Sequence, residues 1–245
     1  MKVVIFAGGR GSRLEEETRG LIPKPMVAIG DRPILAHIIG LYSSHGFKDF
    51  IIAGGYRADS IEAWADAIMS YPYYRDEIVK VALTGIDTQT GGRLKRLAAD
   101  IGDETFMLTY GDGLADINLL ALLDFHRRMR ERSGVAMTLT AVRPPGRWGA
   151  LTVDGGMARV FTEKSQLVEG WINGGFYVVE PEVLATIAGD ATMLEYDILP
   201  ALAAQNRLAA FQHSGWWLGM DHPRDKATLE ELWEKGTAPW QRLLG

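Results

Sequence analysis

The sequence predicts an α/β fold with a doubly wound, mixed but mainly parallel sheet flanked by helices. Apolar runs typical of buried strands alternate with helical patterns along the first half of the chain. A glycine-rich loop follows the first of these runs, and no low-complexity linker interrupts the series. Repeated strand–helix–strand units favour parallel strands with right-handed crossovers, which collect ligands beyond the carboxyl ends of the strands.

The first half of the chain supplies the alternating elements. Residues 2–7 form a continuous apolar run, as expected of a strand buried on both faces. Residues 33–42 have apolar positions at helical spacing, with Pro33 near the first turn and Gly46 placed to end the helix. A Rossmann-like series follows, with strands at 50–53, 78–83 and 105–109 and helices at 58–69 and 93–101.

The second half of the chain begins with a helix at 119–129, after which the pattern changes. Shorter extended segments follow at 135–142, 150–153, 157–161 and 174–179. Two helical stretches and a strand at 208–213 complete the series. Because no change of composition marks a linker, we expect a single domain over residues 1–245.

Composition and charge limit the classes of function. A chain of 245 residues with 47% hydrophobic and 23% charged residues is typical of a globular protein. The net charge of -5 argues against non-specific binding to nucleic acid, which needs a surplus of Lys and Arg. The lack of cysteine excludes disulfides, thiolate metal sites and thiol nucleophiles. The first apolar stretch is too short for a signal peptide or a membrane span, so we expect a cytoplasmic protein.

The loop "AGGRGSRL", from Ala7 to Leu14, lies where the first strand meets a helix. Its backbone N–H groups can point at a bound anion without side chains in the way, which favours phosphate. It is not the dinucleotide fingerprint, because Leu14 stands at the third glycine position, and it lacks the Gly-Lys-Ser/Thr end of a Walker A loop. On the loop alone, a glycine-rich turn with surface arginines is an equal alternative.

The segment "PKPM" places Lys24 between Pro23 and Pro25. The two prolines fix φ on either side, so the ammonium is presented from a stiff segment. Together, "AGGRGSRL" and "PKPM" resemble the signature of the sugar-nucleotide pyrophosphorylases, which join a nucleoside triphosphate to a sugar 1-phosphate.

The resemblance extends over nearly the whole chain and is to the glucose-1-phosphate cytidylyltransferases in particular. The matching segments are "TGGRLKRLA" (90–98), "TYGDGLAD" (109–116), "PPGRWGAL" (144–151), "EKSQLVEGWINGGFYV" (163–178), "HSGWWLGMDHPRD" (213–225) and "LWEKGTAPW" (232–240). The resemblance implies a nucleotidyltransferase fold and the conversion of CTP and α-D-glucose 1-phosphate to CDP-glucose and pyrophosphate. It also implies Mg²⁺ as cofactor, a homo-oligomer, a nucleotide-binding half over about 1–115 and a sugar-phosphate-binding half over about 116–245.

The catalytic residues that we expect are Arg13 and Lys24. In nucleotidyl transfer the sugar phosphate oxygen attacks the α-phosphorus in line while pyrophosphate departs, so no protein nucleophile is needed. Arg13 should neutralise the β- and γ-phosphates, and Lys24 should sit between the reacting phosphates. The expected nucleotide-binding residues are Ala7, Gly8, Gly9, Gly11, Ser12, Arg13, Thr90, Gly91, Gly92 and Gly111.

The expected metal ligands are Asp112 and Asp221. Asp112 follows an apolar strand between two glycines, which leaves room for a cation and phosphates. Magnesium prefers carboxylate and phosphate oxygens together, and the family has metal carboxylates at both matching positions. The alternatives are a turn-forming aspartate for Asp112 and an N-cap of the helix near Pro223 for Asp221.

The resemblance assigns Glu163, Lys164 and Asn173 to the sugar phosphate, and Trp171 is added as a ring that could stack on the sugar. Glu163 would accept from vicinal hydroxyls, Lys164 would hold the phosphate and Asn173 would bind sugar hydroxyls. The alternatives are a surface ion pair for Glu163 and Lys164, and a turn residue with positive φ for Asn173. Trp171 is in turn a candidate for the core or an interface.

Two departures from the family leave other functions open. The stretch from Tyr71 to Thr90 is shorter than in the family, and the interval from Thr18 to Lys24 is one residue longer. The same chemistry with another nucleoside triphosphate or another phosphorylated acceptor is therefore an alternative. A regulatory nucleotide-binding module is disfavoured because the expected cationic and acidic residues are all present. The segment "HRRMRER", at 126–132, is expected to be a solvated helix end.

Overall fold

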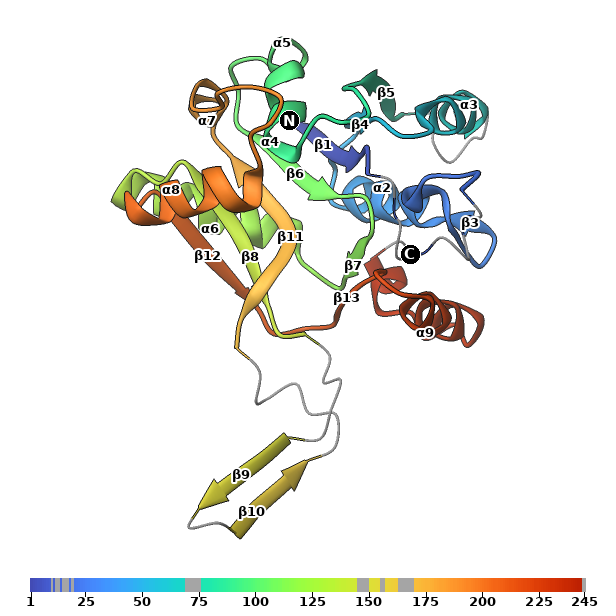
Figure 1. The fold of residues 1–245 in the computed structure, drawn as a ribbon, viewed down its shortest axis with the longest axis vertical. Coiled ribbons are helices and arrows are strands. Elements are labelled where there is room, and N and C mark those ends of the chain that lie inside the picture. The colour runs from blue at the N-terminus through green and yellow to red at the C-terminus, as the bar shows by residue number, and fades with distance from the viewer. Residues whose placement is uncertain are drawn as a thin grey trace.

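A seven-stranded sheet forms the centre of the computed structural model, which describes residues 1–9, 11, 14, 18, 20–68, 76–144, 150–154, 157–162 and 170–243 (Figure 1). The strand order is β12-β8-β11-β6-β1-β4-β5. The bounds of the strands are β1 (Lys2–Ala7), β4 (Asp49–Gly54), β5 (Ile78–Leu83), β6 (Phe106–Tyr110), β8 (Met137–Val142), β11 (Ile172–Val179) and β12 (Leu208–His213).

The sheet is mainly parallel, as predicted. β1 pairs in parallel with β4 and β6, β4 with β5, and β8 with β12. Only β11, among the strands of this sheet, runs antiparallel to its neighbours β6 and β8. The chain returns from β8 to β11 at the same edge of the sheet, where Ile172 pairs with Val142. A return at one edge without a crossover helix makes two neighbouring strands antiparallel.

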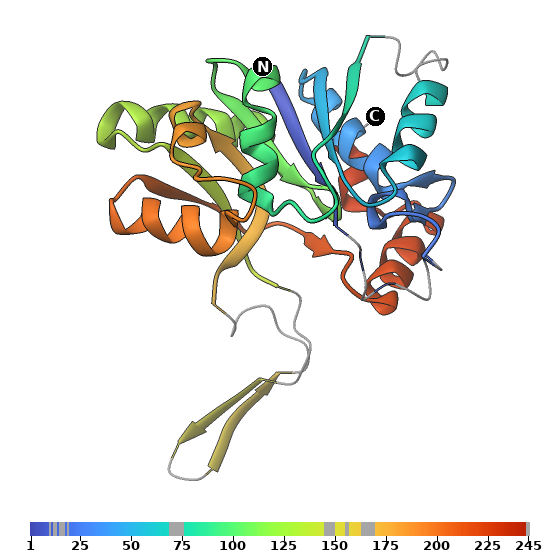
Figure 2. The same ribbon diagram turned by 45° about the horizontal axis from the view of Figure 1, so that its top comes forward.

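Helices cover both faces of the sheet (Figures 1 and 2). One apolar cluster includes residues of α2 (Ile34–Ser44), α3 (Ala58–Ile68), α6 (Leu119–Ser133) and α9 (Pro223–Glu234). The other includes residues of α4 (Thr90–Arg96), α5 (Ala98–Ile101), α7 (Glu182–Ala185) and α8 (Leu199–Ala204). Along β1, Val3 and Ile5 belong to the first cluster and Val4 and Phe6 to the second. Burial on both faces explains why β1 is apolar without alternation.

Short elements complete the fold around the edge where the parallel strands end. On the side of the molecule where α9 lies, β2 (Ala28–Ile29) and β3 (Arg32–Pro33) form a hairpin, and β7 (Gly113–Ala115) pairs with β13 (Trp217–Gly219). The η2 turn (Lys24–Met26) directly precedes the hairpin. η4 (Leu194–Ile198) is a π-helical turn that continues into α8, and η5 (Pro239–Leu243) follows α9. β9 (Ala150–Asp154) and β10 (Met157–Thr162) form a hairpin that extends away from the sheet in both views.

Two details differ from the sequence-based expectations. The helix expected at 93–101 begins at Thr90 and is divided into α4 and α5 at Leu97. The segment 126–132 is not solvated throughout, because the His126 side chain is buried between Thr138 Oγ1 at 2.8 Å and Glu180 Oε1 at 2.9 Å. Burial lowers the pKa of His126, although the neighbouring Glu180 carboxylate acts in the opposite direction. None of the described helices is long and apolar enough to cross a membrane.

Candidate functional site

The carboxyl ends of the parallel strands meet at one edge of the sheet. β1, β4 and β6 end at Ala7, Gly54 and Tyr110; Ala7 pairs with Gly54, and Tyr110 pairs with Phe6, the residue before Ala7. β11 is antiparallel, so its first residues, including Asn173, come to this same edge. An open α/β sheet binds its ligands in the crevice beyond this edge.

A pocket of about 230 Å³ lies at this edge. Ala7, Gly8, Gly9, Gly11, Thr90 and Gly111, all expected to bind nucleotide, line it together with Lys24 and Asp112. The remaining lining residues are Phe6, Pro25, Thr88, Gln89, Arg93 and Tyr110. The loop after β1, the η2 turn, the start of α4 and the end of β6 therefore share one cavity.

Lys24 lies between the two expected metal carboxylates. Its Nζ is 2.6 Å from Asp112 Oδ2 and 2.8 Å from Asp221 Oδ1. Pro23, which precedes the η2 turn, has extended backbone at φ -74 and ψ 155, and Pro25 is buried. Burial by itself would lower the pKa of Lys24, but Asp112 and Asp221 outweigh it and raise this pKa above the usual 10.5. The ammonium is therefore held in its charged form.

Pairing of β7 with β13 brings Asp221 to Asp112. Gly219 stands opposite Gly113 in this pair, and Met220 N donates to Asp112 O at 2.8 Å. The Asp225 carboxylate, 6% exposed, accepts from Asp221 N at 3.1 Å and from His222 N at 2.9 Å. The N-cap of α9 is His222, so Asp221 is not the cap of this helix.

The two carboxylates fit a hard divalent cation. Oxygen atoms of Asp112 and Asp221 already share one positive charge, the Lys24 ammonium. Within the described part of the chain, no group of three or more His, Cys, Asp or Glu side chains is placed to hold a metal. A divalent cation at this pair would thus take its remaining ligands from phosphate and water, as Mg²⁺ commonly does.

Arg93 forms a wall of the pocket that the sequence analysis did not identify. Its guanidinium donates to Gly8 O and Gly54 O, both at 3.2 Å, to Gly85 O at 2.8 Å and to Thr84 Oγ1 at 2.6 Å. Burial, with a contribution from Arg96, lowers the pKa of Arg93. One buried cation thus ties together the loops that follow β1, β4 and β5.

The glycine after β1 allows this close approach. A Cβ atom added to Gly8 would lie 2.1 Å from Arg93 Cζ, so a larger residue would displace the guanidinium. The first arginine of "TGGRLKR", Arg93, was visible in the sequence, and the structure buries it together with Gly92 in α4. Its partners are backbone carbonyls of distant loops, which no motif reveals.

Gly91 and Gly92 face the segment that contains Asp190 and Thr192, whereas Thr90 lines the pocket. A Cβ atom on Gly91 would lie 2.8 Å from Thr192 O, and one on Gly92 would lie 2.5 Å from Asp190 O. Gly92 N also donates to Thr192 O at 3.1 Å. The two glycines therefore let α4 pack against the segment before η4, and they do not line the pocket of about 230 Å³.

Asn173 and Trp171 lie at the start of β11, outside the pocket lining. Asn173 Oδ1 accepts from Gly175 N at 3.0 Å, and its Nδ2 donates to Tyr177 OH at 2.5 Å. Among the described non-glycine residues, positive φ occurs only at Arg57 and Asn206, so Asn173 is not a left-handed turn residue. The Trp171 ring is 37% exposed and carries the Arg143 guanidinium 4.8 Å from its centre.

Four of the expected site residues lie outside the described residues. They are Ser12, Arg13, Glu163 and Lys164. The described site therefore contains one of the two expected catalytic cations, Lys24, and both of the expected metal carboxylates.

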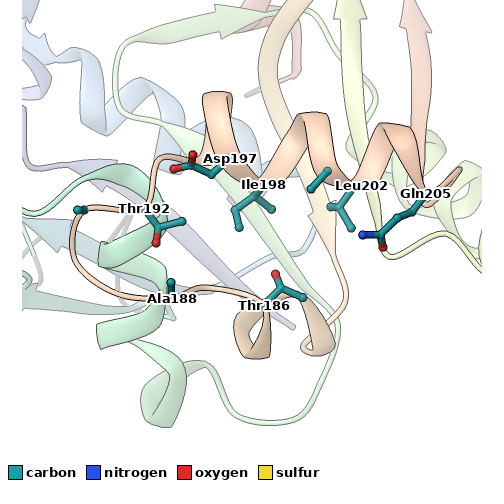
Figure 3. Close-up of a pocket in the computed structure, with 9 residues that line it drawn as sticks. Thr186, Ala188, Thr192, Asp197, Ile198, Leu202 and Gln205 are labelled. Carbon is teal, nitrogen blue, oxygen red and sulfur yellow. The ribbon is translucent and has the colours of Figure 1, made fainter.

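A larger pocket, of about 450 Å³, lies between the segment after α7 and the helix formed by η4 and α8 (Figure 3). Its lining residues are Thr186, Ala188, Ala191, Thr192, Asp197, Ile198, Ala201, Leu202 and Gln205. The single charged side chain in this lining, Asp197, accepts from Met193 N at 2.7 Å. A lining without a cation does not suit a triphosphate, so the smaller pocket is the candidate site.

Comparison with known proteins identifies the family to which the chain is similar. A family model described as nucleotidyl transferase matches residues 2–234. A glucose-1-phosphate cytidylyltransferase of Salmonella typhi is 47% identical, over 98% of this chain and 99% of that protein. A probable glucose-1-phosphate cytidylyltransferase of Bacillus subtilis is 37% identical, over 98% and 99%. The crystal structure of HddC from Yersinia pseudotuberculosis complexed with GMP-PN shares the fold, with a TM-score of 0.68 and 24% identity over 95% and 99% of the two chains.

Proposed function

The chain belongs to the nucleotidyl transferase family, and on this premise we propose that it converts CTP and α-D-glucose 1-phosphate to CDP-glucose and pyrophosphate. The convergence of Lys24, Asp112 and Asp221 beside the pocket carries this proposal. The identity of 47% to a glucose-1-phosphate cytidylyltransferase, over nearly the full length of both chains, supports the choice of substrates.

The reaction is an in-line displacement at the α-phosphorus of CTP. A phosphate oxygen of glucose 1-phosphate forms the new P–O bond, and the bond to the departing pyrophosphate breaks. The protein contributes position and charge, because the attacking oxygen belongs to the substrate. In this proposal the Lys24 ammonium holds the reacting phosphates, and Arg13 neutralises the charge that develops on pyrophosphate.

Family members generally use a divalent metal, and we propose Mg²⁺ held by Asp112 and Asp221. The ion supplies charge neutralisation at the phosphate oxygens when it is bound. Asp225 holds the backbone on which Asp221 stands. The β7–β13 pair keeps the two carboxylates at one point of the site, so the chain itself fixes where the ion can bind.

Base selection is assigned to backbone groups around the pocket. Gly8, Gly9 and the segment from Thr88 to Thr90 leave room for a flat ring, and their N–H and C=O groups can read its edge. Cytosine and uracil differ by an amino group in place of a carbonyl, which a backbone carbonyl or N–H distinguishes. Arg93 fixes the Gly8 carbonyl, so it takes part in this selection through the shape of the loop.

The sugar phosphate is assigned to the start of β11. Asn173 and Trp171 would contact the sugar, together with Glu163 and Lys164. The proposal also includes a homo-oligomer in the cytoplasm, as the family resemblance implies.

The test is a panel of substrates read as pyrophosphate release. CTP, UTP, GTP and ATP are each combined with glucose 1-phosphate, mannose 1-phosphate and galactose 1-phosphate in the presence of Mg²⁺. The proposal predicts that CTP with glucose 1-phosphate gives the highest kcat/KM and that the product is CDP-glucose. A higher kcat/KM with another pair would refute the substrate assignment, and nucleotide binding without any pyrophosphate release would refute the catalytic one.

A further inference from the structure

A line of hydrogen-bonded side chains connects the wall of the nucleotide pocket with Asn173. It begins at Glu195, the second residue of the η4 turn. Thr90 Oγ1 donates to Glu195 Oε2 at 2.7 Å, and Tyr110 OH donates to Glu195 Oε1. Both Thr90 and Tyr110 line the pocket. One carboxylate thus holds two residues of the pocket wall.

The line continues from Tyr110 to β11. Tyr177 OH donates to Tyr110 OH at 3.2 Å, and Asn173 Nδ2 donates to Tyr177 OH at 2.5 Å. The two tyrosine rings also meet edge to face, with their centres 5.9 Å apart. The end of β6, the start of β11, the start of α4 and η4 are joined by this line.

A donor at one end of the line and an acceptor at the other make all of its hydrogen bonds point the same way, from Asn173 to Glu195. The Gly175 N–H donates to Asn173 Oδ1, so the amide nitrogen is the atom that faces Tyr177, and an amide nitrogen can only donate. The Glu195 carboxylate, when ionised, can only accept. Each hydroxyl between them must therefore donate towards Glu195. Burial raises the pKa of Tyr177, and burial with Tyr177 and Glu195 raises that of Tyr110, so both hydroxyls keep their protons.

Local structure around Glu195 supports a specific role. Leu194 N donates to Thr90 Oγ1 at 2.8 Å, so the Thr90 hydroxyl has one acceptor and one donor. The surrounding turn is π-helical, a conformation that is rare and often found at functional sites. The neighbouring Tyr196 is 75% exposed, whereas Glu195 points to the pocket wall. The turn thus places one carboxylate inward.

We propose that Glu195 is a positioning residue that acts through Tyr110 and Tyr177 to orient the Asn173 amide for the sugar. This inference rests on the proposed role of Asn173 in acceptor binding. With Nδ2 bonded to Tyr177 and Oδ1 to Gly175, the amide retains one N–H and one oxygen lone pair for sugar hydroxyls. The same carboxylate fixes Thr90 and Tyr110, so the nucleotide and acceptor parts of the site are positioned together.

Two variants break the line at different points. Tyr177→Phe removes the central hydroxyl and leaves Glu195 bonded to Thr90 and Tyr110. Glu195→Gln replaces one acceptor by a donor, so the hydroxyl of Thr90 or of Tyr110 loses its acceptor and must turn its O–H away from this side chain. Tyr196→Phe is the matched control, since it changes an exposed residue of the same turn.

The measurement separates KM for each substrate from kcat. Tyr177→Phe should raise the KM for glucose 1-phosphate about 10-fold and leave that for CTP within about twofold. Glu195→Gln should raise the KM for glucose 1-phosphate and the KM for CTP. The double variant should have the same KM for glucose 1-phosphate as Glu195→Gln alone, because the two changes interrupt the same line of hydrogen bonds. Tyr196→Phe should match the wild type.

A merely structural role predicts a different result. If the melting temperature falls in both variants while the KM for glucose 1-phosphate stays at the wild-type value, the positioning role is wrong.

Substrate identity is decided first, on the wild-type protein with the panel above. Should another pair be preferred, the proposed function fails, and the KM comparison with that pair still decides the role of Glu195. Calorimetric affinities for nucleotide and sugar phosphate replace KM values if the wild type shows no turnover.

Discussion

Lys24 and Asp221 stand 197 positions apart in the chain, and their Nζ and Oδ1 atoms are 2.8 Å apart. Asp112 joins the same ammonium from the middle of the chain, at 2.6 Å. Three segments thus meet at one charge, beside a pocket lined by the glycine-rich loop. The meeting point depends on the β7–β13 pair and on the rigid η2 turn, both of which are small elements outside the main sheet.

Replacement of the central cation should abolish catalysis while leaving the carboxylates in place. Lys24→Met removes the charge that, in the proposed mechanism, faces the phosphates, and we expect kcat/KM to fall at least about 100-fold. The two carboxylates then repel each other, so Mg²⁺ should raise the melting temperature of this variant more than that of the wild type. Lys48→Met, at an exposed ion pair with Asp76, is the control. Wild-type kcat/KM in Lys24→Met would contradict the assignment.

Loss of one metal carboxylate should reduce turnover without unfolding the protein. Asp112→Asn keeps the shape of the side chain, and we expect a large decrease in kcat at every Mg²⁺ concentration, because an amide oxygen is a weaker ligand. Asp59→Asn, on the exposed surface of α3, controls for the loss of a negative charge. The measurement is kcat as a function of Mg²⁺ concentration for Asp112→Asn and for the control Asp59→Asn. Normal turnover of Asp112→Asn across the titration would show that Asp112 is not a metal ligand.

Removal of the buried guanidinium should weaken both the fold and nucleotide binding. Arg93→Met removes the guanidinium donor shared by the carbonyls of Gly8, Gly54 and Gly85 and leaves its cavity unfilled by polar groups, and we expect the free energy of unfolding to fall by about 2–4 kcal/mol. KM for the nucleotide should rise, because the Gly8 loop is no longer fixed. Arg96→Met breaks only an exposed pair with Asp190 and should have a much smaller effect. Urea unfolding of the two variants gives the comparison, and equal losses would refute this role of Arg93.

A buried histidine should make stability depend on pH. His37 accepts from Trp240 Nε1 at Nδ1 and contacts Ile29 O through Nε2, so it is neutral with its proton on Nε2. Burial lowers its pKa from 6.5 to about 4, although the Ile29 carbonyl acts in the opposite direction. Between these two values the unfolded chain takes up a proton that the folded protein does not, so stability falls as the pH decreases. The slope is at most about 1.4 kcal/mol per pH unit.

The contribution of His37 is isolated by comparison with His37→Gln. Urea unfolding of both proteins between pH 4 and pH 7 should give a shallower slope for the variant, while carboxylates and His126 titrate in both and cancel in the difference. Parallel slopes would contradict a neutral, buried His37.

The fold was predicted correctly because short sequence patterns are enough to predict most of its strands and helices. β1 and β5 have the predicted bounds, since an apolar run ended by glycine or polar residues is legible without the rest of the chain. The break of the expected helix at Leu97 was missed, because the helical pattern of the sequence is continuous across this residue. The antiparallel direction of β11 also depends on a long return that no short pattern encodes.

The site was only partly predictable for a similar reason. Lys24, Asp112 and Asp221 stand in motifs whose glycines and prolines indicate an exposed, shaped backbone, and the structure brings the three together. Arg93 and Glu195 act on partners 85 and 105 positions away, so their roles depend on tertiary contacts. His126 resembled part of a solvated helix end because arginines follow it, yet its own side chain turns inward to Glu180.

A crystal structure of the wild-type protein with Mg²⁺, glucose 1-phosphate and a CTP analogue that cannot react at the α-phosphorus tests the central claim most directly. The account predicts that the α-phosphate lies within hydrogen-bond distance of Lys24 Nζ, with the metal ion between Asp221 and the phosphates and the base against Gly8 and Thr90. A triphosphate bound elsewhere, with Lys24 still paired only to Asp112 and Asp221, would contradict the account.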